Sequence, residues 1–211
     1  MRYLSLLITV TLSIGGMNFA RAQQANLGAA KKHYELCQSC HGVDGEGNRG
    51  EAGPRLAGQH VWYLQRQLEN FRAGIRGSHD GDTYGQMMRT MAKMLPNQEA
   101  VESVAAYSAT LQAPKPARTD PSGAPDKGKA IFASCQPCHG GRGEGNESLG
   151  GPRLAGQHDW YLLSQLQNFR AGIRGTHEQD TYGQTMRSMA HALLADEQAM
   201  QDVVAYITTL P

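Results

Sequence analysis

Four cysteines and two of the eight histidines have the spacing that could do chemistry in this 211-residue chain. They form two copies of Cys-x-x-Cys-His, at Cys37–His41 and at Cys135–His139. Residues three apart lie on one side of a helical turn, so both thiols of a copy can meet one edge of a porphyrin. The sulfurs would add across the two vinyl groups of a haem while the adjoining imidazole binds the iron. The pattern therefore predicts two covalent haem c groups, held by Cys37, Cys40, Cys135 and Cys138, with His41 and His139 as iron ligands.

Three other uses of paired cysteines are weaker interpretations of the same residues. A redox-active Cys-x-x-Cys needs no following histidine. A structural zinc would have to join two motifs that lie 98 residues apart. The third alternative is a pair of disulfides. All four cysteines of the chain belong to the two motifs, so covalent haem is the favoured interpretation.

An offset of 98 residues also aligns the rest of the two halves, which indicates a tandem duplication. Gly53–His60 recurs letter for letter as Gly151–His158, and Asn70–Gly77 recurs as Asn168–Gly175. A period of this size is that of a domain and excludes a solenoid. We therefore expect two small haem domains.

The sixth position on each iron decides what such a haem can do. An open position binds small molecules, whereas a methionine thioether opposite histidine raises the potential and favours electron transfer. Met88 and Met186 each follow their motif histidine by 47 residues, and Met91 and Met189 lie three residues further on. Methionines can also simply pack a core. Because both pairs recur at one offset, we expect one methionine of each pair to be the sixth ligand.

Histidine is the rival ligand type, because two further histidine pairs also recur. His79 and His177 lie in glycine-rich loops and are the more plausible rivals. His60 and His158 open a predicted helix, and we interpret them as surface residues or hydrogen-bond donors.

The first 22 residues have the pattern of a secretory signal. Met1–Tyr3 carries a positive charge, Leu4–Ile14 is apolar, and Ala20–Ala22 supplies a small-x-small cleavage site. The alternative is an uncleaved anchor, but the apolar run is short for a span of about 20 residues. The sequence thus predicts export to the periplasm, where c-type haem is attached in bacteria.

The remainder predicts an all-α protein of two domains, 23–112 and 127–211, joined by a proline-rich linker, 113–126. Apolar periodicity predicts a helix over 59–73 that Gly74 ends, and closing helices over 97–111 and 196–210. Asp126 is the expected N-cap of the helix that delivers the second motif.

Composition limits the partners and the core. The formal charge is +1, and removal of Arg2 and Arg21 with the signal leaves 18 basic against 19 acidic side chains, so nothing favours nucleic acid. Domains this small bury a limited share of their surface, and only 7% of residues are aromatic, with a mean hydropathy of −0.49. A macrocycle would fill what the side chains do not, so the apoprotein is expected to fold poorly.

Three further motifs carry a family resemblance over essentially the whole mature chain. They are the Gly-Pro-x-Leu-Ala-Gly-Gln loop, the Tyr-Leu-x-x-Gln-Leu-x-x-Phe-Arg-x-Gly helix and the Met-x-x-Met segment, each present in both halves. With the two haem motifs, the chain resembles the dihaem cytochrome c4 family. The resemblance implies two class I cytochrome c domains related by a pseudo-twofold axis, in the bacterial periplasm, which pass electrons toward a terminal oxidase.

The same resemblance implies roles for particular residues. His41 and His139 would be the proximal ligands, and Met88 and Met186 the distal ones. The carbonyls of Pro54 and Pro152 would accept hydrogen bonds from the proximal imidazoles, and Leu56 and Leu154 would pack on the haems. The long loop before Met88 is more similar to members placed beside dehydrogenases, which leaves the partner open.

The expected function is single-electron transfer without catalysis. The expected partners are a respiratory complex or a dehydrogenase as donor and a terminal oxidase as acceptor, with any membrane association only through them. The alternatives are a haem enzyme of peroxidase or thiosulfate-oxidising type and a subunit of a dehydrogenase complex. Two roles are open for Arg55, Arg153, Trp62 and Trp160. In one, all four bind haem propionates. In the other, the arginines are solvated and the tryptophans pack in a core or at the domain interface.

Overall fold

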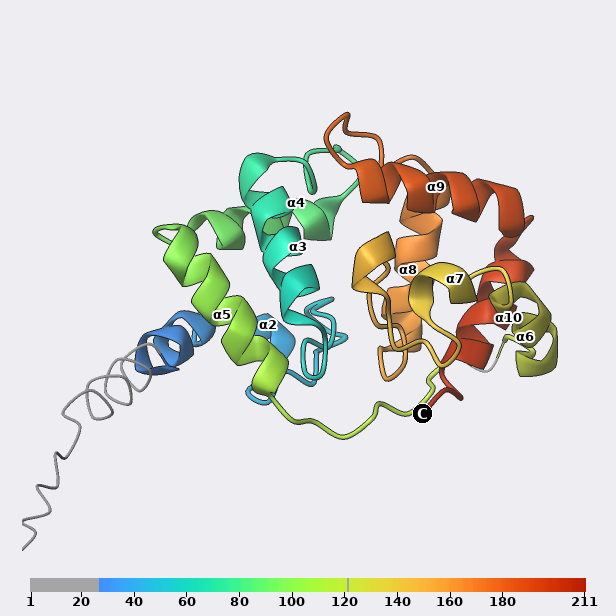
Figure 1. Cartoon of the computed structure of the whole chain (residues 1–211), viewed down its shortest axis with the longest axis horizontal. Helices are drawn as coiled ribbons and strands as arrows, with labels where there is room; N and C mark the ends of the chain where they lie inside the picture. Colours follow the sequence, from blue (N-terminus) through green and yellow to red (C-terminus); the bar gives the residue numbers. More distant parts are fainter. Residues whose placement is uncertain (1–26, 121) are drawn as a thin grey trace, which may run out of the picture.

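The computed structural model describes residues 27–120 and 122–211, and the predicted signal at 1–22 lies outside them. These residues form helices and loops, with two isolated bridges, Asn48 to Gly53 and Asn146 to Gly151, as their only β pairing. The prediction of an all-α fold in two tandem units is therefore confirmed (Figure 1). Within the described ranges no helix is both long and apolar enough to cross a bilayer.

The first domain begins with residues 27–34, which are helical and lead to the first haem motif. The motif forms the short helix α2, a long loop over 42–60 leads to α3, a second loop over 74–82 leads to α4, and a short connection over 94–97 leads to α5. In chain order these elements are α2 (Gln38–His41), α3 (Val61–Ala73), α4 (Thr83–Lys93) and α5 (Gln98–Thr110).

The second domain repeats this order: its helices α7, α8, α9 and α10 correspond to α2, α3, α4 and α5 of the first domain. Helix α6 packs against α10, and α8 packs against α9 and α10. Its elements are α6 (Pro125–Phe132), α7 (Gln136–His139), the 3-10 turn η1 (Glu147–Leu149), α8 (Asp159–Arg170), α9 (Thr181–Leu193) and α10 (Glu197–Ile207).

Side-chain caps fix the starts of the helices that contain the methionines. Asp82 accepts a hydrogen bond from the Gly85 amide at 2.9 Å at the start of α4, and Asp180 does the same for Gly183 at the start of α9. Such caps stabilise a helix start by about 1 kcal/mol. They set where α4 and α9 begin, and so the turn on which each methionine lies.

The prediction that Asp126 caps its helix is wrong. Helix α6 begins at Pro125, its N-cap is Ala124 without a side-chain hydrogen bond, and Asp126 lies in the first turn. Proline at the first helical position has its φ already set for the helix and lacks only an amide that would have no partner there. The carboxylate still favours the positive end of the helix dipole.

Each domain has its own apolar core behind the haem motif. In the first, Tyr34 from the leading helix meets Val101 and Val104 of α5. In the second, Phe132 of α6 takes the place of Tyr34 and is fully buried. The second core also includes Leu162, Phe169, Leu194, Met200, Val203, Val204, Ile207 and Leu210.

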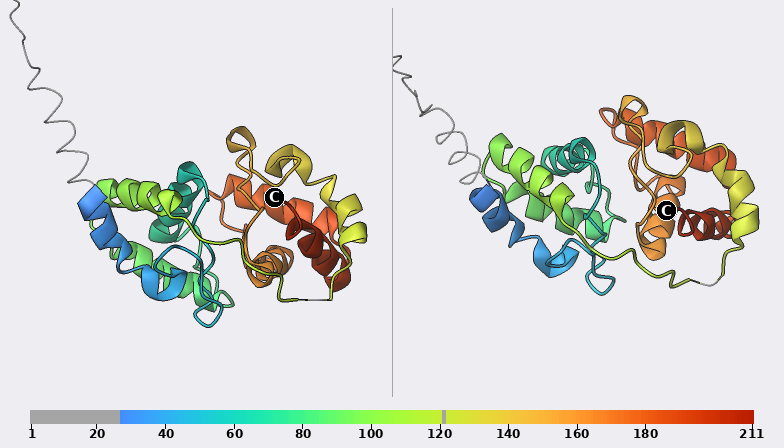
Figure 2. Two further views of the ribbon diagram at one scale, coloured as in Figure 1. Left: turned by 90° about the horizontal axis from the view of Figure 1, so that it is seen from below. Right: turned by 60° about the horizontal axis from the view of Figure 1, so that its bottom comes forward.

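The linker is bound to the protein along its length. Arg55 donates to the carbonyls of Ala113, at 2.6 Å, and Pro114, and Lys115 donates to the carbonyl of Leu210. Figure 2 shows this extended segment running from α5 of one domain to α6 of the other. The proline-rich stretch is therefore a strap rather than a free tether.

A second linker contact is a carboxylate, that of Asp159. It is 2% exposed, and it accepts from the amide of Asp120 at 2.7 Å and the hydroxyl of Thr119 at 2.9 Å, as well as from the Thr119 amide. Burial raises the pKa of Asp159, but these N–H and O–H donors outweigh it and hold the pKa below its usual value. The carboxylate is therefore ionised at neutral pH and binds the linker through charge-assisted hydrogen bonds.

Candidate haem sites

The first motif places an imidazole with one nitrogen occupied and the other available. His41 is 7% exposed and its Nδ1 lies 2.8 Å from the carbonyl oxygen of Pro54. A carbonyl can only accept, so Nδ1 carries the proton and Nε2 keeps its lone pair for a metal. The prediction from family resemblance that the Pro54 carbonyl contacts the proximal imidazole matches this geometry.

Gly53 explains why the chain can bring that carbonyl so close. A Cβ at this position would lie 1.9 Å from the carbonyl oxygen of Cys40, a distance that no side chain tolerates. The loop therefore passes directly over α2, and the next residue, Pro54, meets the histidine ring. Glycine at position 53 is thus a requirement of the site.

Burial controls the charge of the motif residues. It lowers the pKa of His41 below its usual value, against the opposing effect of the hydrogen bond to Pro54, so the ring is neutral. A neutral imidazole is the form that binds a metal. Burial together with the neighbouring Cys40 raises the pKa of the Cys37 thiol to about 11.

The second motif repeats this arrangement. Nδ1 of His139 lies 2.9 Å from the carbonyl oxygen of Pro152, and a Cβ on Gly151 would again lie 1.9 Å from the Cys138 carbonyl oxygen. Burial lowers the pKa of His139, with the Pro152 contact opposing it. The two candidate sites therefore offer the same donor set.

The methionine pairs lie on α4 and α9, one helical turn apart within each pair. Met186 is half-buried and packs against the second core, whereas Met189 is 36% exposed. Met88 and Met91 are both half-buried. The burial difference favours Met186 over Met189, and the shared offset extends that preference to Met88.

The rival histidines are engaged elsewhere. Nδ1 of His79 accepts from the Gly81 amide at 3.0 Å within an exposed loop, and His177 does the same for Gln179 at 3.2 Å. Nε2 of His60 lies 2.6 Å from a carbonyl oxygen in the other domain, as does Nε2 of His158 at 2.7 Å. Of the two interpretations of His60, surface residue or hydrogen-bond donor, this contact matches the donor.

Arg55 lies against the linker and the adjacent loop. Its Nε donates to the carbonyl of Ala57 at 3.0 Å, and both terminal nitrogens reach the linker. Trp62 stacks on His60 with ring centroids 5.7 Å apart, and the Arg66 guanidinium lies over the Trp62 ring at 4.9 Å and over the Tyr63 ring at 5.7 Å. Of the two roles expected for the tryptophan, this geometry matches packing at the domain interface.

Three buried arginine nitrogens provide an independent test of whether haem fits. Nε of Arg76, Arg89 and Arg174 has no hydrogen-bond partner within the described residues. A buried donor without an acceptor costs about 1–3 kcal/mol, so such groups call for one. Haem brings two carboxylates, and the thiols, imidazoles and unpartnered donors together fit it.

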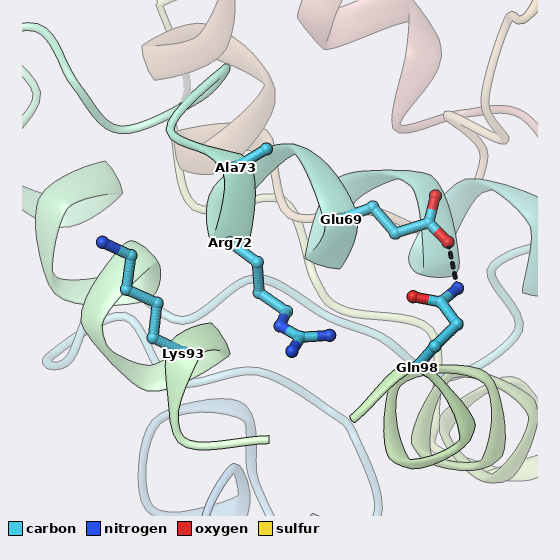
Figure 3. A pocket seen from close by; sticks show the side chains of 5 residues that line it. All are labelled: Glu69, Arg72, Ala73, Lys93 and Gln98. Atoms are coloured by element: carbon cyan, nitrogen blue, oxygen red, sulfur yellow. Dashed lines mark hydrogen bonds between the residues drawn. The ribbon is translucent and has the colours of Figure 1, made fainter. Parts of the chain in front are cut away.

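Among residues 27–120 and 122–211 no three histidine, cysteine or acidic side chains come together as a metal site. One shallow pocket between α3, α4 and α5 is lined by Glu69, Arg72, Ala73, Lys93 and Gln98 (Figure 3), and it contains no motif residue.

The domain interface carries a crossed network that the sequence did not reveal. Arg76 donates to the Tyr161 hydroxyl at 3.2 Å and to Gln165 at 3.0 Å in the second domain. Arg174 reaches back in the same way to Tyr63 at 3.3 Å and Gln67 at 3.0 Å. Their exact recurrence at an offset of 98 was the available signal, but sequence does not say which recurring residues face the partner domain.

The arginines and tyrosines of this network shift one another's pKa values. Burial alone would raise the pKa of Tyr63, but the guanidinium groups of Arg174 and Arg76 lower it below its ordinary value. Burial works against the charge on Arg76, yet Tyr161 and Tyr63 raise its pKa. The reciprocal contacts give the two domains a pseudo-twofold relation. Figure 1 shows the two helices that contribute the tyrosines and glutamines, α3 and α8, in the neighbouring parts of the two domains.

Known proteins share this arrangement. The Cytochrome c family model matches residues 28–112 and again 125–211. A cytochrome c4 of Azotobacter vinelandii is 33% identical over 199 residues, which cover 89% of this chain and 90% of that protein. The crystal structure of reduced recombinant cytochrome c4 from Pseudomonas stutzeri matches with a TM-score of 0.70 and 31% identity, over 87% of this chain and 98% of that one.

The chain is also similar to a protein named for the enzyme from which it accepts electrons. A thiosulfate dehydrogenase electron acceptor from Stutzerimonas stutzeri (strain A1501) is 32% identical over 173 residues, which cover 77% of this chain and 76% of that protein.

Fold and site together define a c-type cytochrome with two haem-binding domains in tandem. The chain belongs to the cytochrome c family and, within it, to the dihaem cytochrome c4 proteins. It is an electron-transfer protein with two covalently attached haem c groups, one on each Cys-x-x-Cys-His motif.

Proposed function

We propose that the mature chain carries single electrons in the periplasm between a respiratory donor and a terminal oxidase or another acceptor. In this proposal His41 and Met88 ligate one iron, and His139 and Met186 ligate the other. The observation that carries it is the repeated site: in both domains a buried histidine has Nδ1 on a proline carbonyl, and a half-buried methionine follows it 47 residues later.

The protein's contribution is to keep each iron environment unchanged between oxidation states. When bound, haem supplies an iron that alternates between the ferric and ferrous states. The Pro54 carbonyl fixes the tautomer and ring orientation of His41, and Pro152 does so for His139. The thioethers of Met88 and Met186 would raise the potential and close the iron to substrate.

The domain division follows the proposed sites. We assign 1–22 to a signal peptide, 23–112 and 127–211 to the two haem domains, and 113–126 to the linker. Placement in the periplasm rests on the signal pattern and on haem attachment after export.

A second candidate is electron acceptor to a dehydrogenase, which the similarity to the thiosulfate dehydrogenase electron acceptor favours. The loop before Met88, which begins after Gly74 and ends at the Asp82 cap, would then face the catalytic partner. Co-purification with a catalytic chain, or reduction by a thiosulfate-oxidising extract but not by a quinol-oxidising one, separates this candidate from the first.

A redox titration with the absorption spectrum recorded at each step tests the proposal. We expect two one-electron waves, low-spin spectra throughout and no binding of carbon monoxide by the reduced native protein. A high-spin haem or a carbon monoxide adduct in one domain would instead indicate an open iron and an enzyme of peroxidase or thiosulfate-oxidising type.

A further inference from the structure

One peptide group, between Pro54 and Arg55, is hydrogen-bonded at both of its ends. Its carbonyl oxygen accepts from Nδ1 of His41 at 2.8 Å. Its N–H donates to Oε1 of Gln157, in the other domain, at 3.1 Å. The motif histidine of the first domain is therefore separated from a side chain of the second domain by a single amide.

The second domain mirrors this contact. The peptide group between Pro152 and Arg153 accepts from His139 at 2.9 Å and donates to Oε1 of Gln59 at 3.2 Å. The same relation thus arises twice, in both directions across the interface.

Each glutamine is held in place by further bonds. Nε2 of Gln157 donates to the carbonyl oxygen of Arg55 at 2.9 Å, and its Oε1 also accepts from the amide of His158 at 3.0 Å. Gln59 makes the equivalent contacts to Arg153 at 2.9 Å and to His60 at 3.0 Å. Neither side chain can turn away from the peptide without losing three hydrogen bonds.

Hydrogen bonds in such a chain reinforce one another. An acceptor on the N–H of an amide shifts electron density toward its carbonyl oxygen, which then accepts more strongly from the imidazole. A stronger bond at Nδ1 makes the ring a better electron donor at Nε2. An electron-rich ligand favours the ferric iron and lowers the reduction potential.

We propose that Gln157 and Gln59 are positioning residues that act across the domain interface, each setting the reduction potential of the haem in the opposite domain through a Pro-Arg peptide. The inference rests on the proposed function, because it requires an iron on Nε2 of each motif histidine. The residue that tunes the first haem thus belongs to the second domain, and the residue that tunes the second haem belongs to the first.

Redox titration of Gln157→Ala holoprotein tests the crossing. The wave of the first-domain haem should shift to higher potential while the second stays in place, and Gln59→Ala should do the reverse. The Met186→Ala variant assigns the waves, because it displaces the one from the second domain. A shift confined to the haem of the mutated residue's own domain would overturn the proposal.

The Nδ1 proton of His41 gives a readout that simple loosening of the interface would not move. Its NMR resonance should move upfield in Gln157→Ala and downfield in Gln157→Glu, since a carboxylate accepts more strongly than an amide. An unchanged resonance in both variants would contradict the proposed path.

Gln165→Ala is the matched control. Gln165 lies at the same interface and accepts from Arg174 at 2.7 Å and Arg76 at 3.0 Å, but it makes no bond to either Pro-Arg peptide. It should leave the His41 resonance unchanged, and an equal shift in this variant would also count against the inference. Failure of the proposed function would appear differently, as the absence of two low-spin waves in the wild-type protein.

Discussion

In the first domain the motif histidine lies 2.8 Å from the carbonyl oxygen of Pro54, and in the second the same contact to Pro152 is 2.9 Å. Around these matched contacts the two domains have diverged. Tyr34 and Phe132 occupy equivalent places beside the motifs, but only Tyr34 has a hydroxyl, which donates to the Gly42 carbonyl at 2.7 Å. Duplication has thus kept the geometry that holds the cofactor and has changed the residues that support it.

The linker and interface show the same divergence. Asp159 binds the linker, whereas its counterpart Val61 is 42% exposed. Arg66 donates to the Gly150 carbonyl at 2.7 Å and lies 4.2 Å from the centre of the Tyr182 ring, and its counterpart is Ser164. The two haem motifs therefore have matching contacts, but the residues at the linker and at the domain interface differ between the domains. The two domains can accordingly differ in stability.

The largest expected effect tests the similarity of the two sites. Met186→Ala and Met88→Ala should each abolish the sulfur-to-iron charge-transfer band of one haem and lower its potential, because loss of the thioether removes the ligand that raises it. Absorption and redox titration measure both changes. Met189→Ala and Met91→Ala are the matched controls, and loss of the band in those variants would transfer the ligand assignment one turn along each helix.

A smaller effect tests the divergence at the linker. Asp159→Asn removes a charged acceptor from buried donors and should lower the free energy of unfolding by about 2 kcal/mol. Denaturant titration of the holoprotein measures it. Val61→Asn, at the exposed equivalent position, should change stability far less, and equal losses in the two variants would show that the linker contact contributes nothing.

The pH dependence of Asp159 has a definite sign. Its pKa is held below the ordinary value of about 3.9, so its contribution is complete above that pH. The contribution is lost as pH falls through the lower pKa of the folded state. The stability difference between wild type and Asp159→Asn should therefore shrink in acid, and a constant difference would indicate that the carboxylate charge is not involved.

The smallest effect concerns the first core. Burial raises the pKa of Tyr34, so its hydroxyl remains protonated and donates to Gly42. Tyr34→Phe should cost about 1 kcal/mol while leaving both redox waves in place, since the motif geometry does not depend on this bond. Calorimetry measures the loss, and a displaced first wave would show that the bond also shapes the haem site.

Much of this architecture could be predicted from the sequence because the chemistry is local. Cys40 and His41 lie in the short helix α2, Cys37 is its N-cap, and Gly74 ends α3 as expected, with a left-handed φ of 77°. Because the sequence repeats at an offset of 98 residues, the residues of the second site could be predicted from those of the first.

The contacts between the linker and the domains could not be predicted, because they depend on which surfaces meet in the folded protein. The sequence is consistent with Arg55 as a propionate ligand or a solvated side chain. In the structure Arg55 holds the linker, because the chain returns past it only in the folded protein. The linker was expected to be a tether, and nothing in its composition indicates that Asp159 binds it. Contacts between segments far apart in the chain have no signature in local spacing.

The most direct test of the account is the haem and metal content of the purified mature protein. We expect two covalently bound haems and two irons per chain, measured by pyridine haemochrome absorbance and metal analysis, both low-spin in the oxidised and reduced states. A protein with one haem or none, or one that carries zinc in place of iron, would contradict it.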